Sequence, residues 1–231
     1  MNIINFCGKR GLGDLVASTS DLLLQLKVDT HIIYWLPDGF DYENTINVIL
    51  TEFTENFHLK ISWEVNCTWS TIRPYQAEEK FGKENFMKTW YFGTGDTKTG
   101  YYVPFKTQWR GNKDGPIILL LNNENYSENY PAWIRGKFFP DDVNQVLLDL
   151  VDNNNYVMIG RPKSLEKSIE MMANCRYMIG FDGGFTHIAC CMNVPQYLVI
   201  NKAPARFLKM WYRKYNYIKL VETHQVFDFL L

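Results

Sequence analysis

The sequence has few features that would hold a chain together by covalent or metal bonds. Its five cysteines, in 231 residues, are odd in number and include no Cys-x-x-Cys pair. Cys190 and Cys191 are adjacent on a predicted helix, where their side chains point about 100° apart and cannot clamp one metal ion together. We therefore expect reduced thiols, no metal site and a cytoplasmic location.

The chain also lacks the apolar segments that insertion into a membrane requires. No apolar run reaches the roughly 20 residues that span a bilayer, so we expect no transmembrane helix. Residues 2–6 resemble a strand and lack the basic-then-apolar order of a signal peptide. A hydrophobic content of 46% with a mean hydropathy of −0.25 is typical of a soluble globular protein that buries a core.

A strong charge of either sign is absent as well. The formal net charge of −1 provides no overall attraction to nucleic acid. Basic and aromatic residues alternate near the C-terminus, at Lys202, Arg206, Lys209, Trp211, Tyr212, Arg213, Lys214, Tyr215, Tyr217 and Lys219. This composition suits contact with phosphates and stacking on bases. It equally suits an amphipathic helix whose rings pack inward, so both interpretations stay open.

Hydrophobic periodicity predicts strands that alternate with helices in the first half of the chain. The expected elements are strands at 2–7, 31–36 and 59–65 and helices at 14–27 and 46–53. This βαβαβ order implies parallel strands covered by helices. Residues 66–115 have poor periodicity, and we assign them to the irregular end of this half and to a linker at 111–116.

A second series of strands and helices follows the linker. We expect strands at 117–121, 156–159, 177–181 and 196–200 and helices at 141–151, 165–173 and 186–192, the second of them capped by Ser164. The sequence therefore predicts an α/β protein with two Rossmann-like domains whose parallel sheets face a cleft. The expected domains are 1–112 and 113–205, with a tail at 206–231 that packs back across them.

The most informative stretch runs from Met178 to Ala189, where an apolar strand meets an Asp-Gly-Gly turn and a helix of small residues follows. Backbone N–H groups at such a turn lie at the positive end of the helix dipole, and glycine lets an anion approach closely. We interpret the Gly183–Gly184 turn as a phosphate cradle, with Thr186 and His187 donating to phosphate oxygens. Asp182 would repel bare phosphate, so we expect it to orient the loop or bind a sugar hydroxyl. An ordinary turn with a structural histidine is the alternative.

A second glycine pair, Gly11 and Gly13, opens the first predicted helix. It partly matches the dinucleotide fingerprint, and Asp38 ends the second strand, where an acid would bind ribose. However, Val16 replaces the third glycine, and Asp14 puts a negative charge where a pyrophosphate would lie. A chemical role for Asp14 would be that of a general base in the cleft. On spacing alone, a structural N-cap aspartate explains Asp14 better.

Lys137 follows the first strand of the second half and precedes that half's first helix. A lysine at this point can reach a diphosphate bound where the strand order reverses. A solvated loop lysine is the simpler alternative.

The order of these motifs resembles that of the heptosyltransferase-like glycosyltransferases, which have the GT-B fold. A Gly-Asp pair opens the first helix, and a Lys-x-x-Pro follows the first strand of the second half. A strand ending in Gly, a Ser-Leu-Glu helix start, an Asp-x-Gly-x-x-His-Ile-Ala motif and an Asn-Val-Pro complete the order. The likeness is best over 117–200, recurs at 1–27, and is poor over 60–110 and in the tail.

The resemblance implies an inverting transferase without an essential metal or other cofactor. A nucleotide-diphosphate sugar would bind mainly the second domain, and the acceptor would bind the first. Asp14 would be the base that takes the proton from the acceptor hydroxyl. The implied donor-binding residues are Lys137, Arg161, Ser164, Glu166, Asp182, Gly183, Gly184, Phe185, Thr186 and His187. The acceptor-binding candidates are Lys9, Arg10, Gly11 and Gly13.

The chain is shorter than typical members of that family, so its acceptor domain would be reduced. A compact chain rich in Asn and Trp is similar to phage-encoded transferases, some of which glycosylate hydroxymethylated bases in DNA. The basic and aromatic tail and the Trp-rich region 63–109 would then face DNA in the host cytoplasm, with the target base flipped from the stack. A saccharide or lipid-linked acceptor, a NAD-dependent oxidoreductase and a catalytically silent nucleotide-sugar binder are the alternatives.

Overall fold

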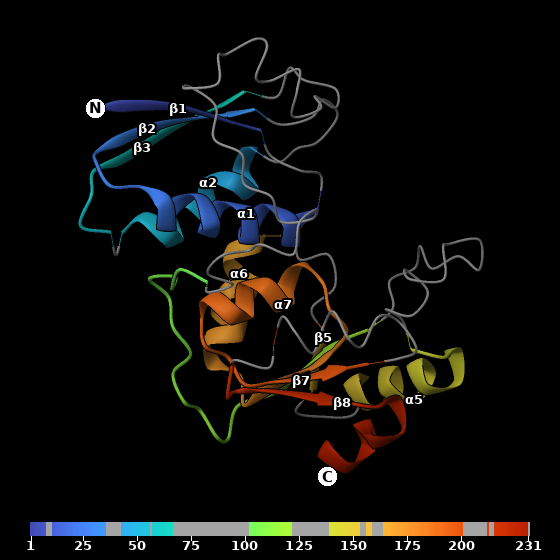
Figure 1. Ribbon diagram of the computed structural model, residues 1–231. Coiled ribbons are helices and arrows are strands. Elements are labelled where there is room, and N and C mark those ends of the chain that lie inside the picture. The colour runs from blue at the N-terminus through green and yellow to red at the C-terminus, as the bar shows by residue number, and fades with distance from the viewer. Residues whose placement is uncertain are drawn as a thin grey trace. The chain divides into compact units, whose positions relative to one another are not determined.

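The computed structural model of the chain describes residues 1–7, 11–35, 43–55, 57–66, 102–121, 139–152, 156–158, 164–200, 212 and 215–230. The chain divides into two compact units, Met1–Lys106 and Thr107–Leu231, and each contains its own parallel sheet (Figure 1). The predicted α/β class with parallel strands is therefore confirmed. Within the described residues, no helix is both long enough and apolar enough to cross a membrane.

The first unit is built on a three-stranded parallel sheet in the order β1-β2-β3. Its elements are β1 (Asn2–Cys7), α1 (Leu12–Gln25), β2 (Thr30–Trp35), α2 (Glu43–Thr54) and β3 (Ile61–Asn66). Cys7 pairs with Trp35 and Trp35 with Asn66, so the three strands end at one level. The buried hydroxyl of Tyr34 has the hydroxyl of Thr19 in α1 as a hydrogen-bond partner at 2.5 Å, which satisfies a polar group inside the core.

The second unit is built on a five-stranded parallel sheet in the order β5-β4-β6-β7-β8. Its elements are β4 (Ile117–Leu120), α5 (Asp141–Asp152), β5 (Tyr156–Met158), α6 (Leu165–Asn174), β6 (Tyr177–Gly180), α7 (Gly184–Cys191), β7 (Gln196–Val199), β8 (Ile218–Val221) and the 3-10 helix η2 (Thr223–Phe229). The chain first places β5 on one side of β4 and then places β6 on the other side. The strand order therefore reverses between β4 and β6, which makes this pair the topological switch point.

Helices cover both faces of the second sheet. Leu147 of α5 and Val226 of η2 pack in one buried cluster with Leu119 of β4 and Ile179 of β6. Figure 1 shows α6 and α7 on the opposite face of this sheet from α5 and η2. Burial on both faces explains why β4 is an uninterrupted apolar run, Ile-Ile-Leu-Leu, and does not alternate with polar residues.

Two features of the second unit differ from the predicted domain limits. Residues 107–112, which we expected in the first domain, belong to the second unit. The expected tail at 206–231 also belongs to this unit, where Ile218–Val221 forms β8 and pairs with β7. We had not predicted β8, because a four-residue segment that contains Lys219 has little pattern of its own and depends on pairing with its neighbour.

Residues 107–112 belong with the second unit because they satisfy carbonyl groups at the ends of its helices. The last four C=O groups of a helix have no acceptor role inside that helix and need outside donors. The donors here are the main-chain N–H groups of Trp109 and Arg110, the Trp109 indole and the Gln108 amide. They reach the carbonyl oxygens of Met192, Ala173, Cys175 and Cys191, respectively, over 3.0, 2.9, 2.7 and 3.1 Å. This segment therefore fixes the C-terminal ends of α6 and α7.

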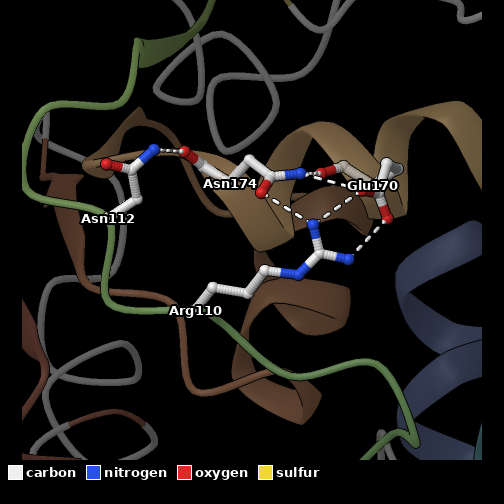
Figure 2. A network of polar contacts seen from close by, with 4 residues as sticks. All are labelled: Arg110, Asn112, Glu170 and Asn174. Atoms are coloured by element: carbon white, nitrogen blue, oxygen red, sulfur yellow. Dashed lines mark hydrogen bonds and ion pairs between the residues drawn. The ribbon is translucent and has the colours of Figure 1, made fainter.

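A polar network fastens the same segment to α6 (Figure 2). Arg110 donates from Nη1 and Nη2 to the two carboxylate oxygens of Glu170 over 2.8 and 3.2 Å, and from Nη1 to Oδ1 of Asn174 over 2.8 Å. Asn112 donates from Nδ2 to the main-chain oxygen of Asn174 over 3.1 Å. The hydrogen bonds from Arg110 and then from Asn174 lower the pKa of Glu170 below its ordinary value. Both charged side chains are more than half exposed, at 54% and 57%, so solvent screens most of their attraction.

We expect Arg110→Gln to lower the free energy of unfolding by about 1 kcal/mol or less at pH 7, as for other exposed ion pairs. Because the folded state lowers the pKa of Glu170, the stabilisation is present above the unfolded pKa of about 4.3 and is lost as the pH falls through the folded value. The difference between wild type and variant, measured by urea unfolding, should therefore shrink towards zero on acidification. Lys113→Gln removes the same charge from an exposed position nearby and should show no such pH dependence.

Candidate functional site

The turn between β6 and α7 lies at the switch point of the second sheet. Leu120 of β4 pairs with Gly180 of β6, so the two central strands end at the same level. Ligands of open α/β sheets bind beyond the carboxyl ends of the strands, at the point where the strand order reverses. Asp182 and Gly183 follow β6 after the single residue Phe181 and therefore lie at this position.

Two glycines of this region are required for different reasons. A Cβ atom on Gly180 would lie 2.3 Å from Cβ of Leu120, so close packing of β4 and β6 requires glycine there. Gly183 is the N-cap of α7 and has extended backbone angles, φ −168° and ψ −174°, which any residue can adopt. Among the described residues, the nearest atom to a Cβ on Gly183 would be the Phe181 oxygen at 3.9 Å. Within the described part of the chain, neither conformation nor packing therefore requires glycine at 183, and no described side chain crowds this side of the start of α7.

The Asp182 carboxylate is held by two side chains of the second unit. Tyr212 donates its hydroxyl to Oδ1 of Asp182 over 2.5 Å, and Nε2 of His187 lies 3.6 Å from the same oxygen. The side chains of His187 and Asp182 are only 7% and 13% exposed, and Tyr212 is 1% exposed. The rings of His187 and Tyr212 have centroids 6.4 Å apart. This geometry suits an aspartate that orients the turn, one of the two roles we expected for it.

The first turn of α7 uses some of its predicted anion donors within the protein. Thr186 is buried and donates its hydroxyl to the Phe181 oxygen over 3.1 Å. The main-chain N–H groups of Thr186 and His187 donate to the Gly183 oxygen over 3.0 and 3.3 Å. The preceding amides, of Gly184 and Phe185, are the ones that helix geometry leaves without an acceptor inside the helix. The Thr186 hydroxyl, which we expected to donate to a phosphate, is therefore used within the protein.

Of the other predicted donor-binding residues, the structure describes Ser164 and Glu166. Ser164 caps α6 as predicted, because its Oγ accepts the N–H of Lys167 over 3.3 Å. Glu166 is exposed in the first turn of the same helix. Lys137 and Arg161 fall outside the described residues, as do the acceptor-binding candidates Lys9 and Arg10.

The start of α1 in the first unit differs from the start of α7. Gly11 is the N-cap of α1, so Asp14, in the third helical position, is not the N-cap aspartate of the structural alternative. Gly13 is the second residue of the helix and is partly buried. Oδ2 of Asp14 lies 3.3 Å from the position that a Cβ on Gly11 would take. The carboxylate thus lies beside Gly11, which is itself exposed.

The described aromatic residues of the tail pack within the second unit. Tyr212 is buried, and Tyr217 donates its hydroxyl to the Cys190 oxygen over 3.1 Å. Lys219 lies over the ring of Tyr197, 5.5 Å from its centroid. These contacts agree better with aromatic rings that pack inward than with aromatic rings that stack on bases. The predicted basic residues from Lys202 to Lys214 lie outside the described residues.

The described tryptophans of the region 63–109 belong to different units. In the first unit, Trp63 donates its indole N–H to Oδ1 of Asn47 over 2.9 Å. Trp109 belongs to the second unit, and its indole is bonded to the end of α6 as described above. Both rings are partly buried. Trp69 and Trp90 lie outside the described residues.

The described cysteines of the second unit are buried thiols. Burial raises the pKa of Cys175 to about 12, and burial with the neighbouring Cys190 raises that of Cys191 well above its ordinary value. A nucleophile or metal ligand would need the thiolate, which such burial disfavours. Within the described part of the chain, no three His, Cys, Asp or Glu side chains gather where a metal ion could be held.

Comparison of this chain with protein-family models, with curated proteins and with solved structures found no match. Among the described residues, the features that bear on function are therefore the uncrowded N-cap at Gly183, the oriented Asp182 and the partly buried Asp14.

We expect Asp182→Ala to lower the free energy of unfolding by about 1–3 kcal/mol, because it removes the acceptor of a buried hydroxyl. Asp182→Asn keeps an amide oxygen for Tyr212 and should cost less. Urea unfolding followed by circular dichroism measures both. Asp114→Ala, at an exposed acid of the same unit, is the control, and equal stability of the two alanine variants would contradict the structural role of Asp182.

Proposed function

We propose that this chain is an inverting glycosyltransferase that moves a hexose or pentose from a nucleoside-diphosphate donor to a hydroxyl acceptor. The observation that carries the proposal is the open N-cap at Gly183, at the switch point of the second sheet. Phosphate groups bind at such helix starts because main-chain N–H groups and the helix dipole both favour negative charge. The motif order that resembles heptosyltransferase-like enzymes supports transfer of a sugar over other uses of a diphosphate.

In this proposal the second unit binds the donor. The amides of Gly184 and Phe185 face the diphosphate, and the absent side chain of Gly183 leaves room for it. Tyr212 and His187 contact the Asp182 carboxylate, which in this proposal orients the turn. We assign Lys137 to the diphosphate and Arg161 to the nucleoside. Ser164 and Glu166, at the start of α6, are also assigned to the nucleoside.

The first unit supplies the base and the acceptor site, which makes the two units the two domains of a GT-B enzyme. Asp14 accepts the proton of the acceptor hydroxyl as that oxygen attacks the anomeric carbon. The new carbon–oxygen bond forms opposite the bond to the leaving diphosphate, which breaks and takes its electron pair, so the anomeric configuration inverts. The amides at the start of α7 stabilise the negative charge that grows on the leaving group.

The carboxylate beside the N-cap of α1 favours this assignment over a NAD-dependent oxidoreductase. Asp14 lies next to Gly11, and its negative charge would repel a pyrophosphate bound at this helix start. In this proposal the two glycine turns therefore have different roles. The main-chain N–H groups after the turn before α7 bind an anion, and the Asp14 carboxylate after the turn before α1 accepts a proton.

For the acceptor we propose a hydroxymethylated base in DNA, with a saccharide as the competing substrate. Tyr212 and Tyr217 make their hydrogen bonds within the second unit, so binding of DNA would depend on the basic residues of the tail. Contacts of lysine and arginine with phosphates weaken steeply as salt rises. Transfer to modified DNA, to unmodified DNA and to simple saccharides, compared at two salt concentrations, distinguishes these acceptors.

We expect Gly183→Val to weaken the binding of UDP and ADP about tenfold or more, because the new side chain fills the space beside the phosphate-binding amides. The extended backbone suits valine, so the free energy of unfolding should fall by only about 1 kcal/mol, the usual cost of a poor N-cap. Calorimetry with each nucleotide measures the affinity. Gly180→Ala should do the reverse, since it crowds Leu120 and costs about 1–3 kcal/mol of stability without entering the anion site. Unchanged affinity in Gly183→Val would remove the basis of the proposal.

Asp14→Asn should lower the rate of transfer by about 100-fold or more, because an amide cannot accept the acceptor's proton. Binding of the donor nucleotide should persist, since the proposed donor site lies in the other unit. The rate is followed as nucleoside diphosphate released from a panel of nucleotide sugars. Asp21→Asn, two turns further along α1, is the matched control: its carboxylate accepts a hydrogen bond from Gln25, which an amide oxygen can also accept. Loss of donor binding in Asp14→Asn would contradict the assigned role.

A further inference from the structure

The C-terminal segment of the chain holds α7 at both of its ends through tyrosine hydroxyls. Tyr212 donates to the Asp182 carboxylate just before the helix, and Tyr217 donates to the Cys190 oxygen in its last turn. Main-chain hydrogen bonds order this segment: Tyr215 donates to the Tyr212 oxygen over 3.0 Å, Ile218 donates to the Tyr215 oxygen over 3.2 Å, and Gln196 of β7 donates to the Tyr217 oxygen over 2.9 Å. Ile218 then begins β8, which is paired with β7, so the sheet anchors this segment.

The two tyrosines bear on different parts of the helix. Asp182 immediately precedes the N-cap Gly183, so Tyr212 acts on the turn whose amides point to the proposed diphosphate. Tyr217 acts on the opposite end, where Gln108 and Trp109 also donate to carbonyls. The Tyr212 ring is buried, so packing would keep a phenylalanine ring in the same place and only the hydroxyl would be lost.

We propose that Tyr212 is a positioning residue of the diphosphate site. By holding Oδ1 of Asp182 it fixes the Asp182–Gly183–Gly184 turn, and so it aims the amides at the start of α7 before the ligand arrives. A turn that is already ordered loses less conformational freedom on binding than a mobile one, and affinity rises accordingly. The ligand in this inference rests on the proposed function, whereas the ordering of the turn does not.

Hydrogen exchange of single amides measures the ordering directly. The N–H groups of Thr186 and His187 donate to the Gly183 oxygen and report on the start of α7, and that of Val194 donates to the Ala189 oxygen and reports on its end. In Tyr212→Phe, exchange of Thr186 and His187 should accelerate at least about tenfold while that of Val194 stays near the wild-type rate. Tyr217→Phe removes the same group from the other end of the same helix and should accelerate only Val194.

Calorimetry with UDP, ADP and pyrophosphate measures the consequence for binding. Tyr212→Phe should weaken the binding of each probe about fivefold or more, and Tyr217→Phe should leave it unchanged. Because Tyr212 acts through Asp182, adding Tyr212→Phe to Asp182→Ala should produce no further loss. Equal acceleration at both ends of α7, unchanged exchange at Thr186, or equal affinity of the two phenylalanine variants would overturn the inference. If wild type binds none of the three probes, the proposed function fails, and the exchange comparison still decides whether Tyr212 orders the turn.

Discussion

The close approach of β6 to β4 is the constraint on which the candidate site depends. With no side chain at Gly180, the backbone of β6 can lie against Leu120, and pairing of these two residues ends both strands at one level. The Asp182 turn then emerges where the strand order reverses. A side chain at 180 would crowd Leu120 and destabilise the pairing of these strands, so a packing requirement in the sheet determines which two strands end together before the turn.

Helix α7 has eight residues, and hydrogen bonds from other segments of the chain stabilise both of its ends. Short helices gain most of their stability from tertiary contacts. The segment that begins at Thr107 satisfies carbonyls at the C-terminal end of α7, and Tyr217 adds a hydroxyl there. Tyr212 and His187 fix the residue before its N-terminal end. Segments far apart in the chain therefore converge on this short helix.

The two glycine-containing helix starts resemble each other in sequence and differ in chemistry. At α1 the Asp14 carboxylate lies beside the N-cap glycine, and at α7 no side chain of the described residues lies within 4 Å of a Cβ on the N-cap glycine. A carboxylate therefore lies close to one helix start and not to the same side of the other. This difference is the physical basis for assigning base and donor to different units.

Many elements were predictable because their signals are local. The apolar run of β4, the Ser164 cap of α6 and the Asp-Gly-Gly turn before α7 each depend on neighbouring residues, and each lies where we predicted it. Strand β8 and the placement of residues 107–112 were missed because both depend on partners more than 15 residues away, in β7 and at the ends of α6 and α7. The Thr186 hydroxyl was predicted to meet a ligand, and the fold instead directs it to the Phe181 oxygen.

By itself, then, the sequence determined the alternation of strands and helices, the parallel sheets and the position of the Asp-Gly-Gly turn before α7. Only the tertiary structure decided that Gly180 is needed for packing, that the Asp14 carboxylate lies beside Gly11, and that Tyr212 holds Asp182. The reason is that periodicity and capping act over a few residues, whereas the side chain that completes a hydrogen bond, or fills a space, can come from any part of the chain that folding brings near.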